Sequence, residues 1–279
     1  MENYLKKNYD FENPELISIV DDLPLWSAPF GLKLMDVVHY KKNIRALDIG
    51  FGLGFPLLEI AMRLGSTSQV TGIDPWRQAH KRLQLKLKLS HVENVGLVEG
   101  VAEAMPFADH SFDLIFSNNG INNVQDLSKS LQECYRVAKN DAQFVFTFNL
   151  EQTFIEFYTI FRETLKELGL QHYEQKIDAH IYSKRKPLAE MRSAVEKAGF
   201  KIVEIYKDVF HYRFADGTSM LNYFPFNLSF LPSWKKIVPE EQQEKIFHHI
   251  EIKMNRMAAV NNGFTMQVPF ATFDCIKIG

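Results

Sequence analysis

The stretch that decides the fold is residues 44–54, IRALDIGFGLG, followed by the helical pattern PLLEIAMRLG at residues 56–65. Residues 44–49 form a short apolar run that predicts a strand, and glycines then stand at positions 50, 52 and 54. Glycines let a backbone turn sharply and approach a ligand without intervening side chains. The helix beyond them begins with backbone N–H groups that have no partner inside the helix. This order of strand, glycine loop and helix predicts a ligand site at the end of the strand.

Asp74 strengthens this prediction, because it ends the next apolar run, QVTGID at residues 69–74. A carboxylate at the end of the second strand can accept hydrogen bonds from both hydroxyls of a ribose. The glycine spacing narrows the class of ligand. A dinucleotide fingerprint would place glycines at 50, 52 and 55, but position 55 is Phe and the third glycine is at 54.

Apolar runs and helical patterns alternate along most of the chain, which predicts an α/β fold with a mainly parallel sheet and right-handed crossovers. Helices are expected over residues 28–40, 56–65, 76–90, 126–138 and 187–198. Strands are expected over residues 44–49, 69–74, 95–100, 112–118, 142–150, 200–207 and about 264–278.

Two insertions interrupt this alternation. Residues 151–186 carry an extra helix and a polar loop after the fifth strand, and residues 215–262 are mostly helical after the sixth strand. Strands of a parallel sheet bind ligands at their carboxyl ends, and both insertions leave from that edge. We therefore expect the two insertions to form a helical lid over one active face.

The composition excludes several classes of protein. Of the 279 residues, 46% are hydrophobic and 24% charged, so the chain can bury a core. A net charge of −2 argues against a broad nucleic-acid-binding face or a polybasic membrane anchor. No apolar run approaches the roughly 18 residues of a membrane span. With two cysteines and no signal-peptide pattern, a cytoplasmic protein without a metal site is expected.

The glycine pattern, with Asp48 two residues before the first glycine, resembles the first motif of class I S-adenosylmethionine-dependent methyltransferases. The resemblance continues at GID (72–74), at EGVAEAMPFADHSFDLIFSN (99–118) and at YRVAKND (135–141), and it covers roughly residues 44–150. It is greatest to the small-molecule branch that includes the ubiquinone and menaquinone C-methylases. The resemblance implies a three-layer, Rossmann-like, seven-stranded sheet, mostly parallel with the last strand antiparallel. An N-terminal helical segment (1–43) would precede the methyltransferase domain (44–279).

The resemblance also implies roles for residues at matching positions, with S-adenosylmethionine as the cofactor. The three glycines would line the methionine and ribose side of the cofactor, and Asp48 would orient the loop and help hold the methionyl amino group. Asp74 would bind the ribose. The full implied cofactor set is Asp48, Gly50, Gly52, Gly54, Asp74, Pro75, Trp76, Ala102, Glu103 and Asn118.

Position 101 departs from the family pattern. The family often has Asp just before the Ala-Glu pair, where it accepts a hydrogen bond from the adenine amino group, but this chain has Val101. We therefore expect adenine recognition to rest on backbone groups or on Glu103.

Aromatic residues indicate where the methyl acceptor binds. Nine of the chain's aromatic residues fall within residues 206–234, and the spacing of the aromatics in 154–161 puts much of that set on one helix face. Core packing explains most aromatic side chains, but an apolar acceptor pocket is the alternative. The residues expected to line that pocket are Trp26, Phe30, Phe154, Phe157, Phe161, Tyr223 and Phe226.

The expected reaction is methyl transfer to a small, largely apolar or aromatic molecule, and it does not require an essential base. His211, Tyr212 and His180 are weak candidates for a general base, should the acceptor be a hydroxyl of high pKa. His248 and His249 are adjacent on a helix and point to different sides, so they do not form a zinc pair.

Two other functions stay open at this point. One is an NAD(P)-dependent oxidoreductase, although Phe55 and Asp48 argue against it. The other is a protein that binds the cofactor without turnover, and Val101 is the residue that favours it. We expect no nucleic-acid or membrane partner, and a homodimer is possible because exposed aromatics could also form a subunit contact.

Overall fold

The computed structural model describes residues 6, 9–21 and 25–279 and divides the chain into two compact units. The first, here called the sheet unit, comprises Phe11–Asn149, Pro187–Asp208 and Phe270–Gly279. The second, called the helical unit, comprises Leu150–Lys186 and Val209–Pro269 together with the described residues up to Asp10. Both predicted insertions fall within the helical unit. Their role as a lid stays a prediction.

The strands form one seven-stranded sheet in the order β3-β2-β1-β4-β5-β7-β6. The strands β1 to β5 are parallel, and β7 pairs antiparallel with β5. This confirms the predicted mostly parallel sheet with an antiparallel last strand. The strands are β1 (Arg45–Ile49), β2 (Gln69–Asp74), β3 (Val95–Glu99), β4 (Phe112–Asn118), β5 (Ala138–Asn149), β6 (Phe200–Phe214) and β7 (Phe264–Lys277).

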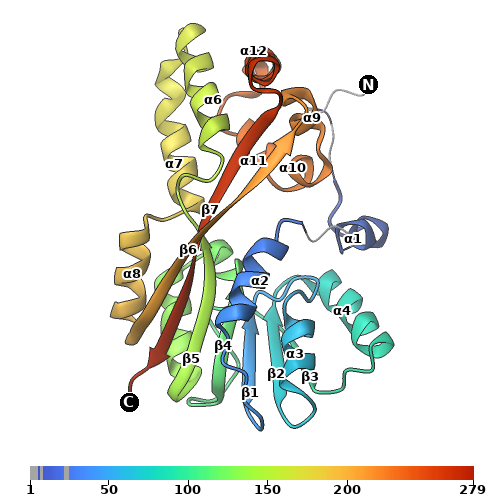
Figure 1. Ribbon diagram of the computed structural model, residues 1–279, viewed down its shortest axis with the longest axis vertical. Helices are drawn as coiled ribbons and strands as arrows, with labels where there is room; N and C mark the ends of the chain where they lie inside the picture. The colour runs from blue at the N-terminus through green and yellow to red at the C-terminus, as the bar shows by residue number, and fades with distance from the viewer. Residues whose placement is uncertain (1–5, 7–8, 22–24) are drawn as a thin grey trace. The chain divides into compact units, whose positions relative to one another are not determined.

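Helices cover both faces of the sheet unit (Figure 1). On one face, apolar residues of α2 (Ala28–Val37), α3 (Leu57–Leu64) and α4 (Arg77–Leu89) form a single core cluster with β1, β2 and β4. Val145 of β5 joins this cluster, whereas its neighbours Phe144 and Phe146 point to the other face, because successive strand residues alternate. On that other face α5 (Leu127–Val137) contacts α8 (Leu188–Lys197). The result is the predicted three-layer arrangement.

The helical unit has an aromatic core of its own. Trp234 stacks on Phe157 with 4.1 Å between ring centroids, and Phe154 packs against Phe226 and Phe230 at 5.2 and 5.1 Å. The helices of this unit are α6 (Ile155–Glu167), η3 (Gln171–Tyr173), α7 (Glu174–Lys184), α9 (Gly217–Asn222), α10 (Phe224–Ser229), α11 (Leu231–Lys235) and α12 (Glu240–Asn261).

Four elements differ from the sequence-based expectation. The polar loop expected before residue 186 contains the helix α7, in which Ile177 is the one fully buried residue, so no apolar stripe marks it. The strand β6 continues to Phe214, beyond the expected end at 207, and β5 begins at Ala138 instead of 142. An additional short helix, α1 (Pro14–Asp21), lies in the opening segment and packs against α4.

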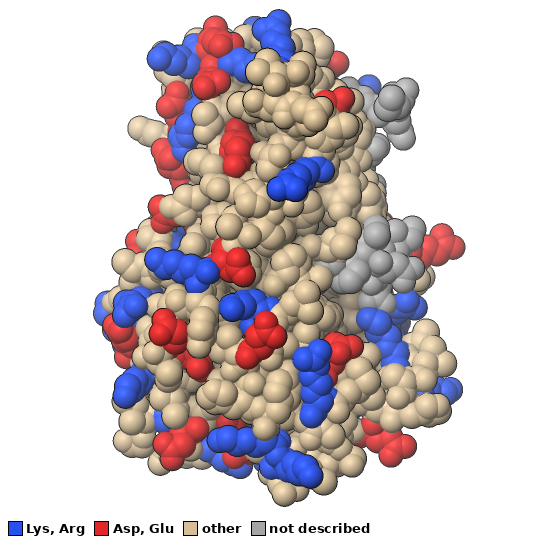
Figure 2. All heavy atoms as spheres, in the orientation of Figure 1, with Lys and Arg blue, Asp and Glu red and all other residues tan. Residues whose placement is uncertain are grey.

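Charged side chains of both signs are interspersed on the face shown in Figure 2. No helix in the described part of the chain is long and apolar enough to cross a membrane. Among those same residues, no three His, Cys, Asp or Glu side chains come together as a metal site would require.

Candidate functional site

A cleft of about 640 Å³ lies at the carboxyl ends of the central strands, within the sheet unit. This volume suits a ligand of nucleoside size. The walls come from the segments that follow four adjacent strands, β1 to β4. The cleft is lined by Ile49, Gly50, Gly52, Ile73, Asp74, Pro75, Trp76, Gly100, Val101, Ala102, Glu103, Gly120, Asn123, Val124, Gln125, Asp126 and Lys129.

Asp74 is the anchoring carboxylate of this cleft. Its Oδ2 accepts a hydrogen bond from the backbone N–H of Gly52 at 2.9 Å, and its Oδ1 accepts one from Trp76 at 2.8 Å. Only 8% of Asp74 is exposed. Each carboxylate oxygen has a second lone pair, so the side chain can still accept two hydrogen bonds from a ligand. The two backbone bonds therefore set the orientation of the carboxylate and join it to the glycine loop.

Two of the three glycines of the loop face the cleft, and the third has a packing role. Gly50 has φ +76° and approaches Gly120 so closely that a Cβ at Gly50 would lie 2.8 Å from the Cα of Gly120. Gly54 has φ +100° and packs against Leu83 of α4, whose Cδ1 a Cβ would meet at 2.5 Å. Gly54 thus seats the loop on α4 and lies outside the lining of the cleft.

Asp48 lies beneath the glycine loop and is completely buried. Neither carboxylate oxygen has a hydrogen-bond partner among the described residues. Burial raises the pKa of Asp48 well above its ordinary value, and the carboxylate of Asp74 raises it further. A buried carboxylate without a partner is costly, so this side chain is suited to receive a cationic or hydrogen-bond-donating group from a ligand.

Glu103 connects two walls of the cleft. Its Oε1 accepts hydrogen bonds from the backbone N–H groups of Gln125 and Asp126 at 2.6 and 3.1 Å. Asp126 in turn caps α5 by accepting from the backbone N–H of Lys129 at 3.0 Å. Glu103 therefore holds the loop after β4 against the loop after β3.

The remaining implied cofactor residues separate into two groups. Pro75, Trp76 and Ala102 line the cleft beside Val101, of which 43% is exposed. Asn118 does not belong to this lining. Its Nδ2 donates to the backbone carbonyl of Ser27 at 3.1 Å, and its Oδ1 accepts from the hydroxyl of Thr147 at 3.1 Å.

The wall formed by Gly120 and residues 123–126 is the part of the cleft that the sequence reasoning missed. A Cβ at Gly120 would collide with the backbone oxygen of Ile49 and lie 2.6 Å from the hydroxyl of Ser117. A glycine two residues after the fourth predicted strand, at the same sheet edge as the glycine loop, was the signal that could have indicated this wall.

The predicted acceptor residues lie in two places. In the sheet unit, Trp26 is half-buried and packs at 5.2 Å against Phe30, which is fully buried and contacts Phe270 at 4.8 Å. The other five lie in the helical unit, where Tyr223 is half-buried and Phe154, Phe157, Phe161 and Phe226 are buried in the aromatic core. Their assignment to an acceptor pocket stays a prediction.

Two of the three base candidates, His180 and Tyr212, have pKa values unsuited to general-base catalysis at neutral pH. Burial, with the charges of Arg185 and Lys184, lowers the pKa of His180 to about 4. Burial raises the pKa of Tyr212, and Tyr223 raises it further. His211 is an exposed residue of β6.

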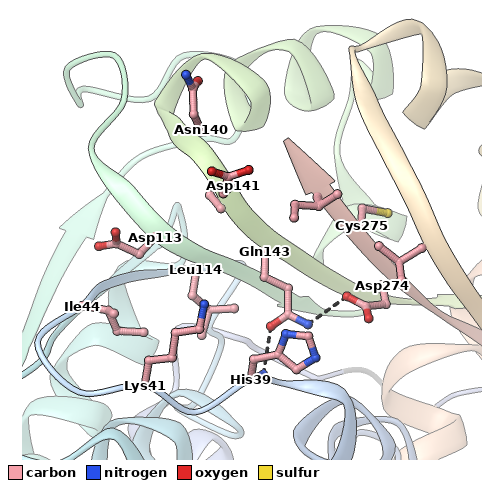
Figure 3. A pocket seen from close by; sticks show the side chains of 13 residues that line it. His39, Lys41, Ile44, Asp113, Leu114, Asn140, Asp141, Gln143, Asp274 and Cys275 are labelled. Atoms are coloured by element: carbon pink, nitrogen blue, oxygen red, sulfur yellow. Dashed lines mark hydrogen bonds between the residues drawn. The ribbon is translucent and has the colours of Figure 1, made fainter. Parts of the chain in front are cut away.

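A second pocket, of about 250 Å³, lies at the opposite edge of the sheet (Figure 3). There the side-chain amide of Gln143 donates to Oδ1 of Asp274 at 2.8 Å and accepts from the backbone N–H of His39 at 2.9 Å. This pocket includes Ile44, which directly precedes β1, and Asp113, which lies at the start of β4. Ligands of parallel sheets bind at the carboxyl ends of the strands, so the cleft around Asp74 is the candidate functional site.

The segment that contains this site is similar to known proteins. Residues 47–146 match a family model whose description is methyltransferase domain. That segment runs from β1 through most of β5 and contains the whole lining of the cleft.

Two curated relatives have the same printed function. A demethylmenaquinone methyltransferase of Staphylococcus aureus (strain MRSA252) is 37% identical over 108 residues, which are 38% of this chain and 44% of that protein. One from Anoxybacillus flavithermus is 29% identical over 179 residues, covering 61% of this chain and 76% of that protein. The match thus spans less than half the length of the Staphylococcus relative.

The fold is also found among solved structures. A methyltransferase candidate from Bacillus halodurans C-125 has a TM-score of 0.59 at 20% identity, covering 89% of this chain and 99% of that one. Residues 47–146 are thus similar in sequence to methyltransferase domains, and the fold is that of solved methyltransferase structures. Over this segment the chain resembles demethylmenaquinone methyltransferases.

Proposed function

We propose that this chain transfers a methyl group from S-adenosylmethionine to a small, largely apolar or aromatic acceptor. The observation that carries the proposal is the Asp74 carboxylate, which the glycine loop holds at the edge of a nucleoside-sized cleft within the matched methyltransferase domain. When bound, the cofactor would supply an electrophilic methyl group on its sulfonium.

The lining of the cleft, together with Asp48, which lies outside that lining, fits such a cofactor. Asp74 would accept hydrogen bonds from the two ribose hydroxyls. Asp48, buried without a partner among the described residues, would complement the positive methionyl amino group. Pro75, Trp76 and Val101 would flank the adenine. Since Oε1 of Glu103 is already used by two backbone N–H groups, we assign recognition of the adenine edge chiefly to backbone groups after β3.

Alignment of acceptor and methyl group, without a strong base, would provide most of the rate enhancement. Correct positioning of two reactants can lower a barrier by about 7–11 kcal/mol. With the pKa of His180 at about 4 and that of Tyr212 raised, neither side chain is a suitable base, which favours an acceptor that is itself nucleophilic near neutral pH. A ring carbon beside an ionised aromatic hydroxyl meets this requirement. The printed names of the two relatives make quinone-type acceptors the first class to test.

Calorimetric titration with S-adenosylmethionine and S-adenosylhomocysteine tests the cofactor assignment directly. Saturable binding of both is expected, and a ligand at 100 times its Kd should stabilise the fold by about 2.7 kcal/mol, which corresponds to roughly 5–10 °C in Tm for a chain of this size. NAD and NADP should give no shift. A shift with either dinucleotide and none with S-adenosylmethionine would instead favour an oxidoreductase.

Asp74→Ala is the decisive variant. It removes two charge-assisted hydrogen bonds to the ribose, each worth about 1.5–3 kcal/mol, so affinity should fall at least tenfold. Glu99→Ala is the matched control, because Glu99 ends the neighbouring strand and forms only a 3.9 Å ion pair with Arg77 outside the cleft. Equal affinities of the two variants would refute the ribose assignment.

Turnover needs its own measurement. Formation of S-adenosylhomocysteine should depend on a quinol-type acceptor and should be lost in Asp74→Ala but retained in Glu99→Ala. Cofactor binding without product from any acceptor tested would support a binding protein that lacks turnover.

A further inference from the structure

Arg185 is a buried cation of the helical unit that has no counter-ion among the described residues. It follows the last turn of α7, and only 5% of its surface is exposed. Its one hydrogen bond from the guanidinium runs from Nη1 to the hydroxyl oxygen of Tyr158 at 3.3 Å. Within the part of the chain that the structure describes, no carboxylate oxygen lies within ion-pair distance of it. Buried arginines are normally paired with carboxylates, so the absence of such a partner requires an explanation.

The groups around the guanidinium are donors and aromatic faces. Trp234 Nε1–H donates to the same Tyr158 oxygen at 3.1 Å. A phenolic oxygen has two lone pairs, and these two donors use both, so the O–H of Tyr158 is left to donate. The guanidinium carbon lies 5.6 Å from the ring centroid of Phe154 and 5.9 Å from that of Tyr158.

The neighbouring residues supply no negative charge. Lys184 and Lys186 flank Arg185 in the sequence, and the ammonium of Lys186 lies over the ring of Tyr182 at 3.5 Å. His180, whose ring centroid is 6.1 Å from that of Tyr158, has a lowered pKa and is neutral at pH 7. The cluster therefore has a positive charge and unused N–H and O–H donors inside an apolar aromatic surround.

From this arrangement we infer that Arg185 and Tyr158 form a binding site for the anionic group of a small molecule, either a carboxylate or a phosphate. Two N–H groups of the guanidinium would donate to two oxygens of the anion, in the bidentate geometry that arginine forms with both groups. The O–H of Tyr158 would donate to one of the same oxygens. The rings of Phe154 and Tyr158 favour an anion attached to an apolar or aromatic body. This site lies wholly within the helical unit and does not depend on the proposed methyl transfer.

Titration of the whole chain with sodium benzoate and with sodium phosphate, at constant ionic strength, tests the site. Saturable binding of at least one anion is expected, and the tighter one identifies the group. Arg185→Gln should weaken that binding at least tenfold, because it removes the positive charge and the two N–H groups that donate to the anion. Tyr158→Phe, which keeps the ring, should also weaken it, by roughly 10- to 150-fold for the loss of one hydrogen bond to a charged group.

Arg162→Gln is the matched control, since Arg162 belongs to the same unit but pairs with Asp178 at 2.6 Å and should leave anion binding unchanged. If Arg185→Gln fails to fold, Arg185→Lys keeps the charge and should still lose affinity for the bidentate anion. Identical titrations of wild type and the Arg185 variant, or no saturable binding of either anion to wild type, would overturn the inference. Affinity for S-adenosylhomocysteine, measured on the same samples, should not change in Arg185→Gln, which separates this site from the cofactor cleft.

Discussion

At the scale of single residues, the two aspartates at the ends of β1 and β2 have opposite situations. Asp74 accepts two backbone hydrogen bonds and lines the cleft, whereas Asp48 is fully buried and accepts none from the described residues. Asp74 contributes to structure before any ligand binds. The burial of Asp48 costs stability, and a ligand with a positive or donating group would recover this cost.

Asp48→Asn should therefore raise stability while weakening cofactor binding. The folded-state pKa of Asp48 is raised, so above about pH 4 the unfolded chain releases this proton while the folded chain keeps it. The group thus lowers the free energy of unfolding as pH rises, until the folded-state pKa is reached. Denaturant unfolding at a series of pH values from 4 to 8 should show an advantage of the variant that grows with pH.

The control for this comparison is Asp141→Asn, at an exposed aspartate distant from the cleft. Its stability should follow that of wild type at every pH. A stability difference for Asp48→Asn that does not depend on pH would contradict the assignment of a raised pKa. Unchanged affinity of that variant for S-adenosylmethionine would contradict its role at the methionyl amino group.

At the scale of elements, the cleft depends on the close approach of two loops from adjacent strands. The loop after β1 and the 3₁₀ turn η2 (Gly120–Asn123) after β4 meet at Gly50 and Gly120. Hydrogen bonds hold the same wall, since the hydroxyl of Ser117 donates to the backbone oxygen of Ile49 at 2.7 Å and accepts from the backbone N–H of Ile121 at 3.2 Å. There is no space at Gly120 for a side chain.

Gly120→Ala should consequently disturb both the fold and the cleft. The added methyl group would collide with the backbone oxygen of Ile49, which cannot move without disrupting β1. Overpacking of this kind typically costs about 1–3 kcal/mol, and affinity for the cofactor should fall as the walls separate. Denaturant unfolding and calorimetry measure the two effects.

Gly96→Ala is a suitable control, because a Cβ at Gly96 in β3 would meet no atom within 4 Å. It should be neutral or slightly stabilising, since alanine restricts the unfolded chain more than glycine does. If both substitutions had the same effect, the close approach of the two loops would not be what shapes the cleft.

The same elements show how far sequence reasoning reached. The strand, glycine loop and Asp74 were predictable because each follows a local rule of backbone geometry or strand-end chemistry. Gly120 could be noticed as a glycine near the end of a predicted strand, but the reason a glycine is required there could not, since it arises from Ile49 and Gly50, about 70 positions away, which only the folded sheet brings near. The helix α7 was missed because it buries one residue fully. The extension of β6 had a signal, the alternation of Phe210, Tyr212 and Phe214, but these residues were counted among the aromatic residues of 206–234 that indicate the acceptor site.

The aromatic residues illustrate a different limit. Their concentration in residues 206–234 predicted a distinct structural region, and most of that segment lies in the helical unit. Their burial, however, shows that they pack in a core and does not show whether they bind an acceptor. Arg185 was overlooked for the converse reason, since the short basic run Lys184-Arg185-Lys186 looks like solvated surface until the middle side chain is found buried against Tyr158 and Phe154.

At the scale of the whole molecule, the two units have separate cores and contain separate candidate sites. The whole lining of the cleft belongs to the sheet unit, and the Arg185 cluster belongs to the helical unit. The strands β6 and β7 contribute residues to both units. A ligand bound at one site should therefore stabilise mainly the backbone of the unit that contains that site.

Hydrogen exchange with S-adenosylhomocysteine should reveal this division. Backbone amides that a bound ligand holds in place open less often, so their exchange slows. We expect slower exchange in peptides covering residues 49–54, 73–76, 100–103 and 120–126, which line the cleft, and little change in α12 of the helical unit. Asp74→Ala, at the same ligand concentration, should lose most of this protection. Benzoate or phosphate should have the opposite pattern, slowing exchange around residues 158 and 185 in wild type but not in Arg185→Gln. Protection by S-adenosylhomocysteine that was confined to the helical unit would place the cofactor elsewhere and contradict the site derived from Asp74 and the glycine loop.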